Sequence, residues 1–537
     1  MKKIIFSIFT VFMSYVSWSQ SLNVASGGSV YISPKSFMHV EEDLGVDAQG
    51  ALTVQSDATD SGSVIVNGTA NGDISYVRHI NSTNWHFVSA PVIGQSIEDF
   101  AASKDVGSST YTVDGVAVVN DVTRSGTGET GDNYGVSIYE NANNAGTRWE
   151  YYTIPGGSNP ASGNFENGKG YSMKRSSVGT YSFQGTMATG DVTITIPANA
   201  ITPEVSTNHL WSVVGNPYPS FLPANDPDNQ TTSILDLNID NLDPNNAYLQ
   251  VWNGTSYQII NNASPLTYLA PGQGFMVDPK GNNITFTFPE NLQVPQVSTP
   301  ATFYKTAVTP TLVVRMSSDK KTAHTTLKYF SKTTTGLDIG WDAGAYVDVA
   351  PTFALDTHLV SHSKGVNFTL QCLPNTNYET SIVPLSVVAA AKETLTFSSE
   401  AAGLPENIKI YLEDKIENTI TDITTTAHQV NMNTALNGIG RFYIHTTSNV
   451  LSVEEPNMAN TLSIYKTSNA NVRITGLQQK GTATAKIYSI TGKEVLSHTF
   501  SMQTVYDIAL PTNLSTGVYV IQLNTNNSKQ SKKIVIE

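Results

Sequence analysis

Aromatic side chains in two Asn- and Gly-rich segments are the residues of this chain best suited to holding a ligand. Flat aromatic faces can stack on sugar rings, and neighbouring amides can bind the sugar hydroxyls. Ordinary packing across paired strands is the alternative use of the same rings. The candidate glycan contacts are Trp149, Tyr151, Trp252 and Tyr257.

Oxygen-rich side chains offer a second kind of site. Calcium is bound by carboxylate and amide oxygens, and residues 226–246 contain many Asp and Asn. The Gly and Glu positions that an EF-type loop requires do not fit this segment. A structural calcium ion on Asp226, Asp228 and Asp243 therefore stays an open alternative, and no other metal or cofactor is expected.

Catalysis is the third chemistry to consider. A glycoside hydrolase needs two carboxyl groups about 5 to 10 Å apart, and the acids that lie near aromatics are Glu140, Glu150, Asp338 and Asp342. In β-proteins such acids are mostly turn or edge residues. The chain has neither the α/β pattern that carries a Gly-x-Ser-x-Gly elbow nor a His-Glu-x-x-His helix. We expect no enzyme, with a carbohydrate-active enzyme or its binding accessory as the alternative.

The composition limits both the environment and the partners of the protein. Charged residues make up only 14% of the 537 residues, against about 25% in typical globular domains, which suits an extracellular protein. The formal net charge is −14 without a long basic run, so nucleic acid is not an expected partner. A single cysteine, Cys372, excludes disulfides within the chain, and we expect its thiol to be buried.

Short β-strands are the elements that must position the candidate residues. Thr, Ser, Asn, Gly and Val are abundant, which favours many strands joined by polar turns and predicts an all-β, multidomain fold. Between residues 20 and 78, alternating strands at 29–32, 37–40, 51–54 and 63–66 recur about every ten residues. Each is too short to bury a face alone, so this region is predicted to be a β-solenoid-like or stacked-hairpin region.

Residues 79–298 are predicted to be an internally duplicated β-sandwich region. Trp85–Pro91 echoes Trp211–Pro217, and Gly168–Tyr171 echoes Gly272–Phe275 in the same order along the chain. Two such copies would form paired sandwiches, or the two halves of a larger one. A further β-sandwich module is expected at residues 299–448, followed by a linker at 449–460.

The first nineteen residues read as a secretory signal peptide. Met1–Lys3 is basic, residues 4–16 are mostly apolar, and Ser17–Ser19 supplies small residues before a cleavage site at Gln20. The apolar run is too short for a stable membrane anchor, and no later segment approaches twenty apolar residues. We therefore expect export and no transmembrane anchor.

Three strand-like segments occupy the end of the chain, residues 461–537. They are Ala485–Val495 with a Thr-Gly turn, Leu514–Leu523 entered through a Gly, and Ser528–Glu537. This pattern resembles the C-terminal sorting domain (type A) of proteins that Bacteroidetes-type bacteria export by the type IX secretion system. The matching residues are Ile487, Tyr488, Gly492, Val495, Gly517, Val518, Tyr519, Lys532, Lys533, Ile534 and Val535.

The resemblance implies a destination. Proteins of this kind are recognised at the type IX translocon and are secreted or displayed on the outer cell surface. The sorting domain is commonly removed, and a surface glycolipid can then be attached. The central modules, with phrases such as Gly340–Asp342 and Arg441–His445, are similar to β-sandwich regions that precede sorting domains in such proteins. Together with the aromatic candidates, this predicts an adhesin-like protein that binds a glycan or matrix ligand. A structural surface component is a further alternative.

Overall fold

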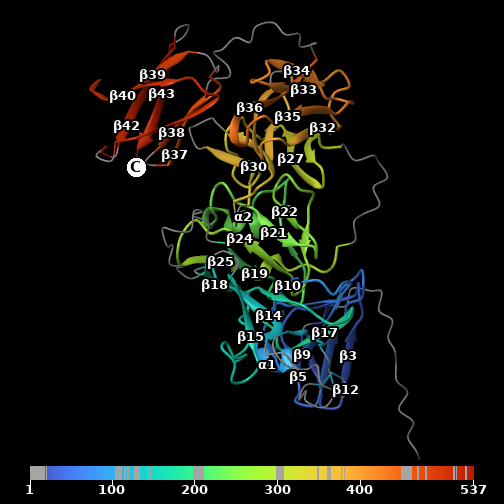
Figure 1. The fold of residues 1–537 in the computed structure, drawn as a ribbon. Helices are drawn as coiled ribbons and strands as arrows, with labels where there is room; N and C mark the ends of the chain where they lie inside the picture. Colours follow the sequence, from blue (N-terminus) through green and yellow to red (C-terminus); the bar gives the residue numbers. More distant parts are fainter. Residues whose placement is uncertain are drawn as a thin grey trace, which may run out of the picture. The chain divides into compact units, whose positions relative to one another are not determined.

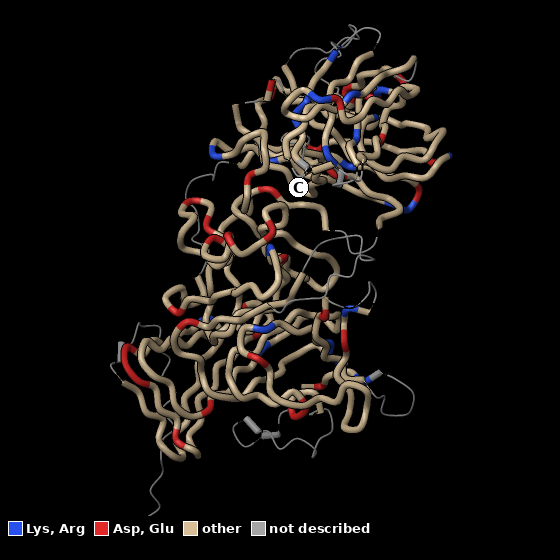
Figure 2. The backbone as a smooth tube through the Cα atoms, turned by 90° about the vertical axis from the view of Figure 1, so that its left-hand side faces the viewer, with Lys and Arg blue, Asp and Glu red and all other residues tan. Residues whose placement is uncertain are grey.

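The chain folds into two compact units, Met1–Ala301 and Thr302–Glu537, in the computed structural model (Figure 1). The structure describes residues 18–19, 21–102, 112–113, 116–117, 120–125, 133–141, 143, 147–196, 211–297, 308–346, 350–359, 365–376, 378–379, 381–448, 463–468, 471–477, 481–511, 514–515, 517–525 and 529–536. Strands dominate these residues, and the expectation of an all-β protein is confirmed. Charged side chains are sparse along the backbone, as Figure 2 shows.

The first unit begins with a coil of short parallel strands. Successive turns of the coil stack in register, so that Leu22 lies opposite Leu44 and Ser29 lies opposite Ala51. Parallel pairing between successive coils is the arrangement of a solenoid, whereas stacked hairpins would pair in antiparallel fashion. The strands are β1 (Trp18–Ser19), β2 (Leu22–Val24), β3 (Ser29–Ile32), β4 (Phe37–Val40), β5 (Leu44–Val46), β6 (Ala51–Val54), β7 (Ser63–Val66), β8 (Ala70–Asn71) and β9 (Asp73–Ile80).

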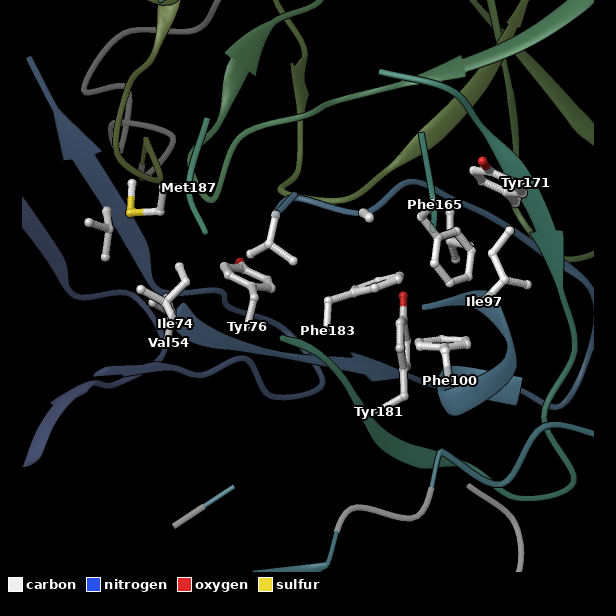
Figure 3. Close-up of a cluster of buried hydrophobic side chains, with 14 of the residues drawn as sticks. Val54, Ile74, Tyr76, Ile97, Phe100, Phe165, Tyr171, Tyr181, Phe183 and Met187 are labelled. Carbon is white, nitrogen blue, oxygen red and sulfur yellow. The ribbon is translucent and has the colours of Figure 1, made fainter. Parts of the chain in front are cut away.

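Strand β9 joins the solenoid to the rest of the unit. It pairs in parallel with β6 and, along its whole length, in antiparallel fashion with β17 (Gly179–Thr186). The solenoid core and the core beneath β17 are therefore continuous. One buried cluster extends from Val54 and Ile74 to the aromatic rings of Phe100 and Phe183, as Figure 3 shows.

Two antiparallel sheets in this unit share one strand order and lie beside one another (Figure 1). The first sheet runs β10 (His86–Val88), β16 (Tyr171–Met173), β14 (Asn133–Tyr139) and β15 (Trp149–Thr153). The second runs β19 (Ser212–Gly215), β24 (Gly274–Val277), β21 (Leu249–Trp252) and β22 (Tyr257–Ile260). An isolated bridge joins Val88 to Gln273, so the sheets meet along β10. An internal duplication would produce this equal order, and the duplication stays a prediction.

Short elements complete the first unit. Helix α1 carries Phe100, whose ring stacks on Phe183 at 4.7 Å between ring centroids. The remaining elements are α1 (Ile97–Ala102), β11 (Thr112–Val113), β12 (Val116–Ala117), β13 (Arg124–Ser125), β18 (Val192–Ile196), β20 (Leu222–Pro223), α2 (Ile234–Asn238), η1 (Ile239–Asn241), β23 (Tyr268–Leu269), β25 (Ile284–Phe288) and η2 (Glu290–Leu292).

The second unit begins with an 11-stranded sheet that folds over its own core. Met316 and Leu412 lie on strands far apart in the sheet order, yet they belong to one buried cluster, which requires the sheet to curve into a sandwich. Its strands are β26 (Thr311–Ser318), β27 (Lys321–Phe330), β28 (Ala343–Gly344), β29 (Ala354–Leu359), β30 (Val366–Pro374), β31 (Ser381–Ala389), β32 (Thr394–Ala402), β33 (Lys409–Asp414), β34 (Thr419–Asp422), β35 (His428–Asn431) and β36 (Leu436–Thr447).

The chain ends in a smaller two-sheet sandwich. One sheet runs β37-β38-β41 and the other β40-β39-β42-β43, and both contribute to a core that includes Ile474, Ile487 and Ile521. Its strands are β37 (Ser463–Ser468), β38 (Asn471–Thr475), β39 (Thr482–Ser489), β40 (Glu494–Ser501), β41 (Val505–Ala509), β42 (Gly517–Asn524) and β43 (Lys529–Ile536).

Two segments named by the sequence lie outside the described residues. They are residues 1–17 of the expected signal peptide and the whole expected linker, 449–460. Of that signal peptide, Trp18 and Ser19 are described, and they pair with β4. Among the described residues, no helix is both long and apolar enough to cross a bilayer. The finer division into domains stays a prediction.

Candidate functional site

The candidate aromatic residues come together where the two sheets of the first unit meet. Tyr139 and Trp149 face one another across β14 and β15, with ring centroids 5.0 Å apart. Trp252 and Tyr257 form the corresponding pair across β21 and β22, at 4.9 Å. Phe87 on β10 joins the two pairs, at 5.5 Å from Trp149 and 6.1 Å from Tyr257. We call these five residues the aromatic strip.

Strand alternation explains why the strip faces away from the cores. Successive strand residues point to opposite faces, and Val88 belongs to the hydrophobic core, so Phe87 points outward. Tyr152 packs against the same core, which turns Trp149 and Tyr151 to the outer face. All but one of the strip rings are half-buried, and Phe87 is 9% exposed.

Tyr151 is the fourth predicted residue, and it lies beside the strip. Its side chain is 37% exposed, and its ring lies 5.6 Å from that of Trp85. The Lys174 ammonium is 6.0 Å from the Trp85 ring centroid. A cationic and aromatic edge of this kind is suited to polar, flat-faced ligands. The structure thus brings the rings of the four predicted residues into one region, in two groups.

Two polar atoms on β21 are buried beside the strip without a hydrogen-bond partner among the described residues. They are the Gln250 Oε1, an acceptor, and the Trp252 Nε1–H, a donor. Gln250 is only 3% exposed and lies two residues before Trp252, so both point to the outer face. An unpaired buried polar group costs about 1–3 kcal/mol. A ligand hydroxyl, which both donates and accepts, has the chemistry to pair with them.

Sequence reasoning did not name Phe87, Tyr139 or Gln250 as site residues. Tyr139 belongs to the repeat pattern that the sequence does contain, because it precedes the Trp149 hairpin as Trp252 precedes Tyr257. Phe87 and Gln250 carry no such local signal. Their role depends on which strands meet, and that pairing is not local.

The calcium candidates are not brought together in one site. Asp226 accepts hydrogen bonds from the Asp228 N–H at 3.1 Å and the Thr232 hydroxyl at 2.7 Å. Asp243 accepts the Asn245 N–H at 2.9 Å. These are turn-forming contacts within short loops. Within the described part of the chain, no group of three or more His, Cys, Asp or Glu residues could hold a metal ion.

Two of the candidate catalytic acids are engaged with the backbone of the second unit. Asp342 is 1% exposed and accepts the N–H groups of Cys372 at 2.6 Å and Asp338 at 2.8 Å. Burial raises the pKa of the Asp342 carboxyl to about 7. Asp338 in turn accepts the Thr334 N–H at 2.7 Å. These contacts tie a loop to β30, which is a structural role, and the Cys372 thiol is buried as expected.

The two remaining acids belong to the hairpin that carries Trp149, and Glu150 has the strand parity opposite to that of Trp149. Glu150 is opposite Ile138 across β14 and β15, and its carboxylate accepts the Asn143 amide at 2.7 Å. The backbone N–H of Glu140 is hydrogen-bonded to the Arg148 carbonyl at 2.6 Å.

The predicted sorting residues lie on the four strands of one sheet, β40-β39-β42-β43, and on one turn of the last sandwich. Ile487, Tyr519 and Ile534 point into its core, and Gly492 forms a turn with φ of +82°. On the opposite face, Val535 is 45% exposed. The strands hold the residues as follows: Ile487 and Tyr488 on β39, Val495 on β40, Gly517, Val518 and Tyr519 on β42, and Lys532, Lys533, Ile534 and Val535 on β43.

The fold and this terminal sandwich define a class of exported all-β protein. Residues 466–537 match the family model of the secretion system C-terminal sorting domain, so the protein is sorted by type IX secretion to the exterior or the outer cell surface. The chain belongs to the family described as Domain of unknown function (DUF8693), whose model matches residues 6–446. No curated protein matches the chain.

Proposed function

We propose that this exported protein is a non-enzymatic adhesin that binds a glycan, or a glycan-bearing matrix, on the aromatic strip. One observation supports this proposal above all others. Phe87 contacts both cross-strand aromatic pairs, and all five rings lie on faces turned away from the two cores. The partly exposed rings offer several flat surfaces in one region, whereas a single cross-strand pair would offer one. Sugar rings bind to such surfaces through their apolar faces.

The polar groups beside the strip support a ligand with hydroxyl groups. A purely apolar ligand would leave Gln250 Oε1 and the Trp252 indole N–H unpaired, whereas sugar hydroxyls carry both the donor and the acceptor that these two groups lack. Attachment to a surface glycolipid after removal of the sorting domain would hold the strip outside the cell.

Affinity electrophoresis of the purified full chain through gels that contain soluble polysaccharides, followed by a glycan array, tests this proposal. Trp149→Ala and Tyr257→Ala should each weaken binding about ten-fold, the loss expected for removal of one well-packed aromatic contact. Trp211→Phe is the matched control, because Trp211 is 2% exposed and lies outside the strip.

Two results would contradict the proposal. One is a chain that no glycan retards and no array position captures. The other is binding that Trp149→Ala and Tyr257→Ala leave unchanged, which would place the ligand elsewhere.

A further inference from the structure

The terminal sandwich carries an outward-facing tyrosine that is nevertheless buried. Ile464 on β37 points into the core of the sandwich, so its neighbour Tyr465 must point to the opposite face. Tyr465 is only 1% exposed. The same alternation applies on β38, where Val472 and Ile474 are core residues and Arg473 between them points outward. Something other than this sandwich therefore covers its β37-β38-β41 face.

The larger sandwich of the same unit shows the matching feature. Phe442 and Ile444 on β36 are core residues, so Tyr443 points outward, yet it is 3% exposed. On β29, Leu355 is a core residue and His358 is on the opposite face, where it is 5% exposed. Rings that point away from the core of their own sandwich and are nevertheless buried must be covered by another part of the chain.

The contacts show that the two faces cover each other. The His358 and Tyr465 rings lie 5.2 Å apart. Gly365, in the left-handed region at φ of +61°, lies so close that an added Cβ would be 3.0 Å from the Tyr465 ring. At Gly440 an added Cβ would be 2.8 Å from the Thr504 carbonyl oxygen. Larger residues at these two glycines would push the modules apart.

We propose that the sorting domain is docked on the preceding sandwich through its β37-β38-β41 face, in a seat formed by His358, Gly365, Gly440 and Tyr443. The docked domain keeps its other sheet accessible, with Val520 37% and Val535 45% exposed. Docking thus orients the domain so that this second sheet faces outward. Separation of the sorting domain uncovers the seat, including the His358 Nε2, which has no hydrogen-bond partner among the described residues.

Carbethoxylation of histidines in the folded full chain, read out residue by residue by mass spectrometry, tests the docking. Diethyl pyrocarbonate reacts with the neutral imidazole. Burial lowers the pKa of His358 to about 4, so its imidazole is neutral near pH 7 and its labelling reports access. His324 is exposed on β27 and provides the reference rate. In the unaltered chain, His358 should react about ten-fold or more slowly than His324.

Tyr465→Glu should undock the domain and bring the rate of His358 within a few-fold of the rate of His324. Val520→Glu is the matched control, since it places the same charge on the other sheet of the same domain, and it should leave His358 protected. Gly365→Ala changes the other side of the same contact, because Gly365 belongs to the larger sandwich. It should accelerate His358 without altering the sorting domain, and so distinguishes undocking from unfolding.

Two outcomes would overturn the proposal. The first is a His358 that reacts as fast as His324 in the unaltered chain. The second is a His358 that stays protected in both Tyr465→Glu and Gly365→Ala, because its burial would then come from the larger sandwich alone.

Discussion

Replacement of Arg441 by Met should strongly destabilise the second unit. The Arg441 guanidinium binds the Asp414 carboxylate in bidentate fashion, with Nη2–Oδ2 at 2.7 Å and Nε–Oδ1 at 3.0 Å. Both side chains are 3% exposed. Without Arg441, a carboxylate stays buried, and its remaining partners within the described residues are the backbone N–H groups of Ile416 and Glu417. Breaking one side of such a pair costs about 3–5 kcal/mol.

The expected change in melting temperature follows from the size of the unit. For domains of about 150–250 residues, 1 kcal/mol corresponds to about 2–4 °C, so Arg441→Met should lower the transition of this unit by roughly 6–20 °C. Differential scanning calorimetry of the full chain measures this transition directly. The first unit contains neither residue, so its transition serves as the internal reference.

The double variant Asp414→Asn/Arg441→Met separates the cost of an unpaired charge from the cost of lost packing. The Asn side-chain oxygen can still accept the Ile416 N–H, and no buried charge remains. The double variant should therefore be more stable than Arg441→Met alone. A shift below about 3 °C for Arg441→Met, or a double variant less stable than the single one, would refute this reasoning.

Two further predictions concern other buried groups. Phe100 is fully buried between Phe165 and Phe183 (Figure 3), so Phe100→Ala should cost the first unit about 3–5 kcal/mol; calorimetry that finds under about 1 kcal/mol would contradict this. Burial raises the pKa of Asp356 to about 7 from an ordinary value of 3.8, so its contribution to stability is complete at low pH and is lost as pH rises through about 7. The stability of the parent chain relative to Asp356→Asn, measured by urea unfolding, should therefore fall between about pH 4 and pH 7, and a constant difference would contradict the assignment.

Local patterns in the sequence were enough to predict four strands of the solenoid. Strands β3, β4, β6 and β7 lie where alternation and turn residues placed them, because both signals depend only on near neighbours along the chain. The shorter strands β2, β5 and β8 were not predicted. The sorting domain was identified by its resemblance to a known family, and the residues that carry the resemblance lie in one continuous segment. The choice between a solenoid and stacked hairpins required strand pairing, which the sequence left open.

Contacts between distant segments were beyond this kind of reasoning. Trp149 and Tyr257 were named as separate candidates, but Phe87, which joins them, was not. Asp342 was named as a candidate catalytic acid, yet its carboxylate accepts the Cys372 N–H from a strand thirty residues away. In both cases the sequence gives the type of residue, and only the pairing of strands decides whether that residue binds, packs or holds a loop.

Aromatic rings on the outward faces of strands are common to the proposed glycan site and to the proposed docking surface. A chain with only 14% charged residues has few charges for the outer faces of its sheets, and rings occupy several outward positions. Where another module covers such rings, as at Tyr443 and Tyr465, they hold two domains together. Where they stay partly exposed, as at Trp149 and Tyr257, the same surface chemistry is available to a ligand. A β-protein poor in charge can thus use one structural device, the outward aromatic ring, both to dock its sorting domain and to bind outside the cell.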